Sequence, residues 1–96
     1  MKSIISNEYQ CLICGRTTNL HRHHIFFGSA NRAISELYGC WCYLCPRHHN
    51  ASNYGVHLNH KLDLQLKQRA QKAWMEKYDG GVEDFIKAFG RNYLDE

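Results

Sequence analysis

Two short pairs of metal-binding residues constrain this sequence more than any other feature: Cys11-x-x-Cys14 and Cys45-x-x-His48. Two intervening residues allow both side chains of a pair to reach one ion, and zinc favours four thiolate and imidazole ligands in a tetrahedral arrangement. The pairs lie far apart in a chain of 96 residues, which supports only a small hydrophobic core. We therefore expect a structural zinc ion that joins two distant segments and contributes directly to folding.

A rival pair, Cys42-x-x-Cys45, leaves open whether Cys42 rather than His48 completes the zinc site. We favour His48 because Pro46 places Cys45 and His48 at a turn that enters a helix. Cys40 and Cys42 alternate along an expected strand and can face the core. Five cysteines are an odd number, and no secretory signal or membrane-spanning run is visible. These features predict a cytoplasmic protein without a disulfide scaffold or a membrane partner.

Histidines form the second chemical group, and all seven lie within the first 60 residues. His23 and His24 point to opposite faces of an ideal strand, so they share one site only at a strand end or bulge. His49 would reach that site from the first turn of the following helix. A pocket with one or two imidazole ligands to a metal ion and one free imidazole suits phosphodiester hydrolysis. The free imidazole can accept a proton from water near neutral pH.

Further residues are candidates for the same pocket. If the helix continued past Gly55, His49, Asn53 and His57 would share one face, and His57 or Asn53 could complete the metal shell. His21 is a candidate for a supporting or phosphate contact. The formal net charge of +3 comes from the first 60 residues, since residues 61–96 hold equal numbers of basic and acidic side chains. Guanidinium groups pair well with phosphate oxygens, which makes three arginines candidates for nucleic-acid binding: Arg22, Arg32 and Arg47.

The residue pattern predicts an α+β chain with a single domain over residues 1–96. Strands are expected at 20–27 and 40–44, a turn at 28–31, a short helix at 32–38 and another helix from Cys45 to Asn53. Apolar residues then recur at steps of three and four, which predicts helices at His60–Tyr78 and from Val82 to Gly90. The expected core positions are Leu62, Leu66, Ala70, Ala73, Trp74, Tyr78, Val82, Phe85, Ile86 and Phe89.

The segments Cys-x-x-Cys, His-His-Ile and Leu-Cys-Pro-x-His-His-Asn together resemble the HNH endonucleases of the ββα-metal class, especially small phage and prophage proteins similar to recombination-enhancement nucleases. The resemblance covers residues 9–57 and implies a ββα-metal, treble-clef-like core, with helices of residues 58–96 packed on it. It implies His24 as the general base and His23 and His49 as ligands of one divalent ion, with His57 as a further candidate. The structural zinc ligands it implies are Cys11, Cys14, Cys45 and His48.

One position departs from this resemblance, because the middle Asn of the motif has no counterpart in residues 38–41. Asn31 is a candidate to replace it. The resemblance implies a DNA endonuclease, bacterial or phage-encoded, with structural Zn²⁺ and catalytic Mg²⁺ or Mn²⁺. Its partners would be DNA and either a second copy or a larger phage or host complex. The alternative is a non-catalytic zinc-knuckle module that binds nucleic acid or protein, which would leave His23, His24 and His49 without a role.

Overall fold

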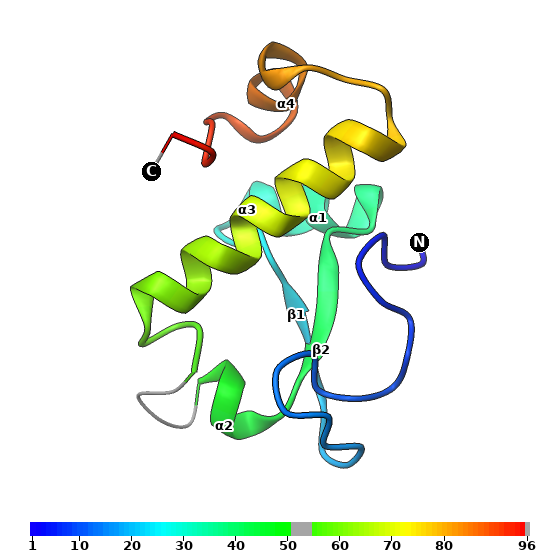
Figure 1. Cartoon of the computed structure of the whole chain (residues 1–96), viewed down its shortest axis with the longest axis vertical. Helices are drawn as coiled ribbons and strands as arrows, with labels where there is room; N and C mark the ends of the chain where they lie inside the picture. The colour runs from blue at the N-terminus through cyan, green and yellow to red at the C-terminus, as the bar shows by residue number, and fades with distance from the viewer. Residues whose placement is uncertain (51–54, 96) are drawn as a thin grey trace.

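A computed structural model of the chain describes residues 1–50 and 55–95. These residues form a small mixed α/β fold around one two-stranded sheet (Figure 1). Within the described ranges, no helix combines the length and apolar character needed to cross a lipid bilayer. The elements follow in the order β1 (His21–His24), α1 (Asn31–Tyr38), β2 (Trp41–Leu44), α2 (Pro46–His49), α3 (His60–Lys77) and α4 (Val82–Phe89).

The two strands are antiparallel, and their register sets which histidines face which side. His23 pairs with Cys42 and His24 pairs with Trp41, so the two histidines project to opposite faces of β1. The sequence pattern predicts a strand over residues 20–27, but β1 is shorter and covers only His21–His24. It ends at His24 because the backbone of Phe26 bonds instead to the side chain of Ser35.

Ser35 fastens helix α1 to the end of β1. Its buried Oγ accepts a hydrogen bond from the Phe26 N–H at 3.1 Å and donates one to the Phe26 carbonyl at 2.7 Å. Removing this hydroxyl would leave two buried backbone groups without a partner. We expect Ser35→Ala to lower the free energy of unfolding by about 1–3 kcal/mol per group left unpaired, measured by urea denaturation. The control is Ser29→Ala, because Ser29 is exposed. If Ser35→Ala unfolded at the same urea concentration as the wild type, the role of Ser35 in fastening α1 to β1 would be contradicted.

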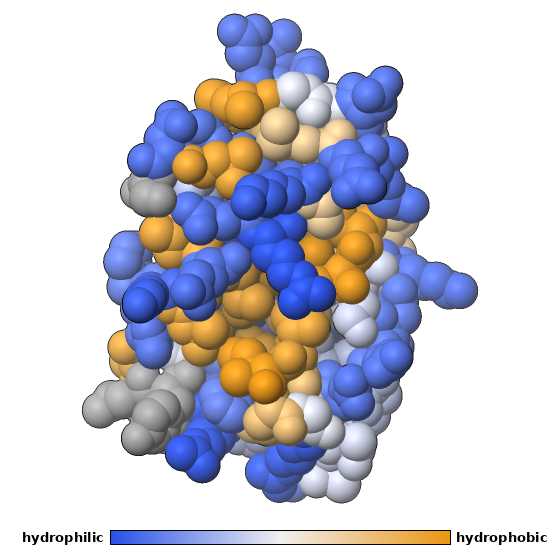
Figure 2. Space-filling view, viewed as in Figure 1, coloured by the Kyte–Doolittle hydropathy of each residue, from blue (hydrophilic) through white to orange (hydrophobic). Residues whose placement is uncertain are grey.

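Helix α3 supplies much of the apolar mass of the core. Asn59 caps its N-terminus, where Oδ1 accepts a hydrogen bond from the Leu62 N–H at 3.1 Å. Leu66, Ala70 and Trp74 are buried, as the periodicity predicts. The helix runs across the sheet (Figure 1), and hydrophilic side chains cover its outer side, with hydrophobic ones beside them (Figure 2). The amphipathic pattern therefore places this helix correctly.

Helix α4 closes the other end of the core through aromatic packing. The buried ring of Phe26 lies 5.3 Å from the ring of Phe85 and 4.5 Å from that of Phe89, measured between centroids. Tyr93, just beyond the helix, adds a third ring at 5.3 Å. Ile86 is 39% exposed, so its prediction as a core residue is wrong. The site-bearing strand β1 is thus anchored through Phe26 to the C-terminal part of the chain.

Candidate metal centres and catalytic pocket

Three thiols and one imidazole converge where the loop before β1 meets the start of α2. Cys11 and Cys14 come from the loop, whereas Cys45 and His48 flank Pro46 at the first turn of the helix. The four ligand atoms lie within 4.8 Å of one another. Cys14 Sγ is 3.7 Å from Cys45 Sγ, and Cys45 Sγ is 3.3 Å from His48 Nδ1. Tetrahedral zinc with ordinary bond lengths would separate sulfurs by about 3.8 Å and sulfur from nitrogen by about 3.5 Å, so the spacing fits a zinc site.

The remaining two cysteines lie in the core. Cys40 and Cys42 are almost completely buried, and burial raises the pKa of each thiol to about 12. Burial also acts to raise the pKa of Cys11, but backbone N–H groups directed at its sulfur outweigh that effect and lower it. The structure therefore groups His48, and not Cys42, with the three converging thiols.

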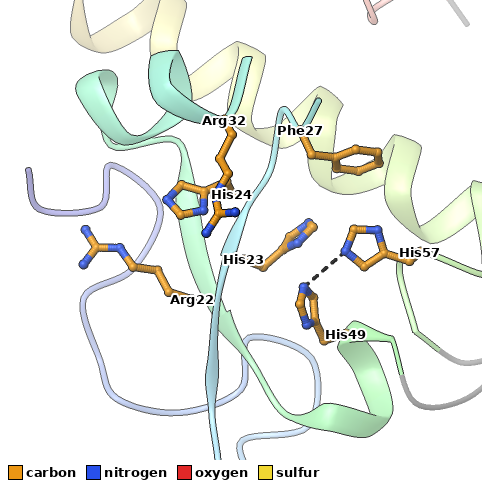
Figure 3. A pocket seen from close by; sticks show the side chains of 7 residues that line it. All are labelled: Arg22, His23, His24, Phe27, Arg32, His49 and His57. Carbon is orange, nitrogen blue, oxygen red and sulfur yellow. Dashed lines mark hydrogen bonds between the residues drawn. The ribbon is translucent and has the colours of Figure 1, made fainter. Parts of the chain in front are cut away.

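A second group of possible metal ligands consists of His23, His49 and His57. Their ligand nitrogens lie within 4.8 Å of one another, and Nε2 of His49 is 3.2 Å from Nε2 of His57. Figure 3 shows the three rings facing a common space beside β1. His23 is 1% exposed, and its Nε2 has no hydrogen-bond partner in the described part of the chain. An unpaired buried nitrogen is costly, whereas a bound ion would satisfy it.

His57 reaches this group by a route different from the expected one. Helix α2 ends at His49, and Asn50 already leaves the helical region with φ −149°. The chain then returns, so that the His57 N–H bonds to the His49 carbonyl at 3.3 Å. Gly55 permits this return, since a Cβ at that position would lie 2.8 Å from the His49 carbonyl oxygen. The expectation of a continuous helical face is therefore wrong, and Asn53 lies outside the described residues.

The surroundings of two of these imidazoles, His23 and His49, favour the neutral form. Burial lowers the pKa of His23 to about 3, with further lowering from His49 and His57. Burial and then His57 lower the pKa of His49 to about 4. His21 Nδ1 lies 2.8 Å from His49 Nδ1, and this hydrogen bond orients the His49 ring with its other nitrogen, Nε2, toward His57. Neutral imidazole is the form that binds metal ions, and a partner on the second nitrogen orients it.

His24 occupies the other side of β1. Its Nε2 lies 3.0 Å from Glu36 Oε1, and Arg22 Nη2 donates to Glu36 Oε2 at 2.7 Å. The hydrogen bond with His24 is the main cause that lowers the pKa of Glu36, and Arg22 adds to it. Sequence reasoning missed Glu36. The only signal was its spacing of four residues from Arg32, which places both on one face of α1.

The two sides of β1 meet in one cavity of about 210 Å³. Arg32 lies on its wall, and its side chain forms no hydrogen bond or ion pair with residues 1–50 and 55–95, whereas Arg22 is engaged with Glu36. Arg47 is on the exposed surface of α2, outside the lining. Asn31 donates to the Phe89 carbonyl, so its side chain is committed to α4. Figure 3 labels the lining residues: Arg22, His23, His24, Phe27, Arg32, His49 and His57.

The described residues thus define a small mixed α/β protein with a Cys₃His cluster that could bind zinc. Such an arrangement is compatible with an HNH-like zinc module. No protein-family model, curated protein or solved structure matches the chain. The function is therefore inferred from the residues of the site.

Proposed function

We propose that this protein is a divalent-metal-dependent endonuclease of the HNH, ββα-metal type that hydrolyses phosphodiester bonds of DNA. The observation that carries the proposal is the convergence of the three-histidine group and His24 on one cavity. A purely structural zinc module has no use for a second set of converging imidazoles, one of them buried without a hydrogen-bond partner at Nε2, beside its zinc ligands. Arg32 on the cavity wall favours an anionic substrate, whereas Arg22 is engaged with Glu36.

Each residue has a chemical task in this proposal. His23, His49 and His57 would hold a divalent ion, which supplies charge stabilisation for the departing 3′ oxygen. His24 accepts a proton from the attacking water. Arg32 pairs with a phosphate oxygen, because its guanidinium lies on the wall shared with His24. The Cys₃His cluster holds the first turn of α2, and with it His49, against β1.

The chemistry of the three imidazole ligands, His23, His49 and His57, indicates which ion they would bind. Magnesium prefers oxygen ligands, whereas imidazole suits transition ions such as Ni²⁺ and Zn²⁺. Three imidazoles therefore favour a transition ion over the Mg²⁺ that the resemblance implies. Mn²⁺ would bind more weakly than Ni²⁺ to the same nitrogen ligands.

We expect His57→Ala to weaken Ni²⁺ binding to the zinc-loaded protein by on the order of tenfold or more, because even the partners behind metal ligands are worth roughly 10- to 100-fold. Titration calorimetry measures this effect without relying on catalysis. His60→Ala is the matched control, since His60 is exposed at the start of α3, outside both ligand groups. Equal Ni²⁺ affinity in wild type and His57→Ala would remove His57 from the ligand set.

A plasmid assay tests the function itself. Zinc-loaded protein is incubated with supercoiled DNA in the presence of Mg²⁺, Mn²⁺ or Ni²⁺, or with no added ion. We expect nicked or linear product only when an ion is added. Binding of the same DNA in a gel shift, with no cleavage under any ion, would favour the non-catalytic zinc module instead.

A further inference from the structure

The contacts around His24 carry an inference about which of its nitrogens reacts. We propose that Glu36 is a positioning residue that fixes His24 with its proton on Nε2, which leaves Nδ1 as the nitrogen that accepts a proton from water. The assignment of the reactive nitrogen rests on the proposed nuclease function. The assignment of the proton does not, because it follows from the hydrogen bond alone.

The proton assignment follows from the chemistry of the pair. An ionised carboxylate can only accept hydrogen bonds, so the contact of 3.0 Å between Glu36 Oε1 and His24 Nε2 requires a proton on Nε2. A neutral imidazole carries one proton, and its other nitrogen then has a free lone pair. Since Nε2 faces Glu36, Nδ1 is the only nitrogen of His24 left to act as a base.

Glu36 is 41% exposed, but both of its carboxylate oxygens have partners, and the N-terminal amine lies 3.7 Å from Oε2. Its second oxygen, Oε2, accepts a hydrogen bond from Arg22 Nη2 at 2.7 Å. The guanidinium of Arg22 lies 3.6 Å from the centre of a Trp41 ring, which restricts its movement. The His24 side chain is only 12% exposed. Side chains from β1, α1 and β2 thus form one chain of contacts that ends at His24.

The same contacts give Arg22 and Arg32 different roles. Arg22 was a candidate for phosphate binding, but its contact with Glu36 assigns it to holding the carboxylate. Arg32 lies beside His24 and Glu36 on the neighbouring wall and remains the arginine for phosphate. Removing Glu36 should therefore affect the rate of the chemical step rather than DNA binding.

Two variants separate the hydrogen bond from the charge. Glu36→Gln keeps an acceptor oxygen, whereas Glu36→Ala removes both acceptor and charge. Glu76→Ala is the matched control, because Glu76 is exposed on α3 and lies outside the His24 cavity. Long-range ¹H–¹⁵N spectra of the zinc-loaded protein without DNA report which nitrogen of His24 carries the proton.

We expect the Nε2-protonated form in wild type, Glu36→Gln and Glu76→Ala, and a mixture of both forms in Glu36→Ala. Predominant Nδ1 protonation in wild type, or an unchanged spectrum in Glu36→Ala, would overturn the proposal. These spectra remain decisive even if the protein does not cleave DNA, so failure of the nuclease function is distinguishable from failure of this inference.

Cleavage kinetics provide the second readout. Partners that orient metal-ligating histidines are worth roughly 10- to 100-fold, and we expect a fall in kcat of that order for Glu36→Ala. KM should change little, and Glu36→Gln should recover part of the rate. Wild-type kcat in Glu36→Ala, or an equal loss in Glu36→Gln and Glu36→Ala, would contradict positioning through the hydrogen bond.

Discussion

Replacement of His24 by alanine is expected to lower the rate of DNA cleavage by roughly 10²- to 10⁴-fold, the usual contribution of a general base. His24 lines the cavity that also contains the three-histidine group, yet it is not one of the three converging ligands. The substitution should therefore leave zinc content and Ni²⁺ binding near those of the wild type. Single-turnover cleavage of a labelled duplex, together with metal analysis, measures both quantities.

The control for His24→Ala is His60→Ala, which removes an exposed imidazole outside the cavity. It should cleave DNA at the wild-type rate. A His24→Ala protein that cleaves at the same rate as His60→Ala would contradict the assignment of the base. Loss of zinc or of folded structure in His24→Ala would show instead that the substitution acts through stability.

Disruption of the Cys₃His cluster is expected to unfold the protein. Structural zinc contributes on the order of 10–16 kcal/mol of binding free energy in small zinc modules, which exceeds the ordinary stability of a small domain. Cys45 is central here, because its Sγ approaches both Cys14 Sγ and His48 Nδ1. We expect Cys45→Ser to lose zinc and cooperative thermal unfolding, measured by elemental analysis and circular dichroism.

The matched control for this prediction is Cys42→Ala. Cys42 is as buried as Cys45, but it lies outside the ligand group. Its replacement should reduce stability modestly through lost packing while one zinc ion per chain is retained. A folded, zinc-loaded Cys45→Ser protein, or loss of zinc in Cys42→Ala, would show that different cysteines bind the ion.

Features that depend on short spacing were predictable from the sequence. The pairs Cys11-x-x-Cys14 and Cys45-x-x-His48 are local motifs, and the structure brings their ligand atoms together. Helices α3 and α4 follow from apolar periodicity, and Gly90 ends α4 in the left-handed region with φ 92°. Each of these signals lies within a few residues of the structure it specifies.

Features that depend on contacts between distant segments were not predictable in the same way. Helix α2 was expected to continue toward Asn53, but it ends at His49, and backbone bonds from the returning chain satisfy its last carbonyls. The strand expected at 20–27 stops at His24 because the Ser35 side chain bonds to the backbone beyond it. Both differences arise where a partner from elsewhere in the chain replaces a regular hydrogen bond.

The sequence by itself determined the kind of chemistry available: thiols and imidazoles at metal-ligand spacing, and histidine pairs on a strand and at a helix start. The tertiary structure decided which of these side chains lie together in each site. Successive side chains of β1 face opposite sides of the strand. His23 therefore lies beside His49 and His57, whereas His24 lies beside Glu36. Residue type sets which atoms can bind or donate, whereas only packing of β1, α1 and α2 sets which of them meet.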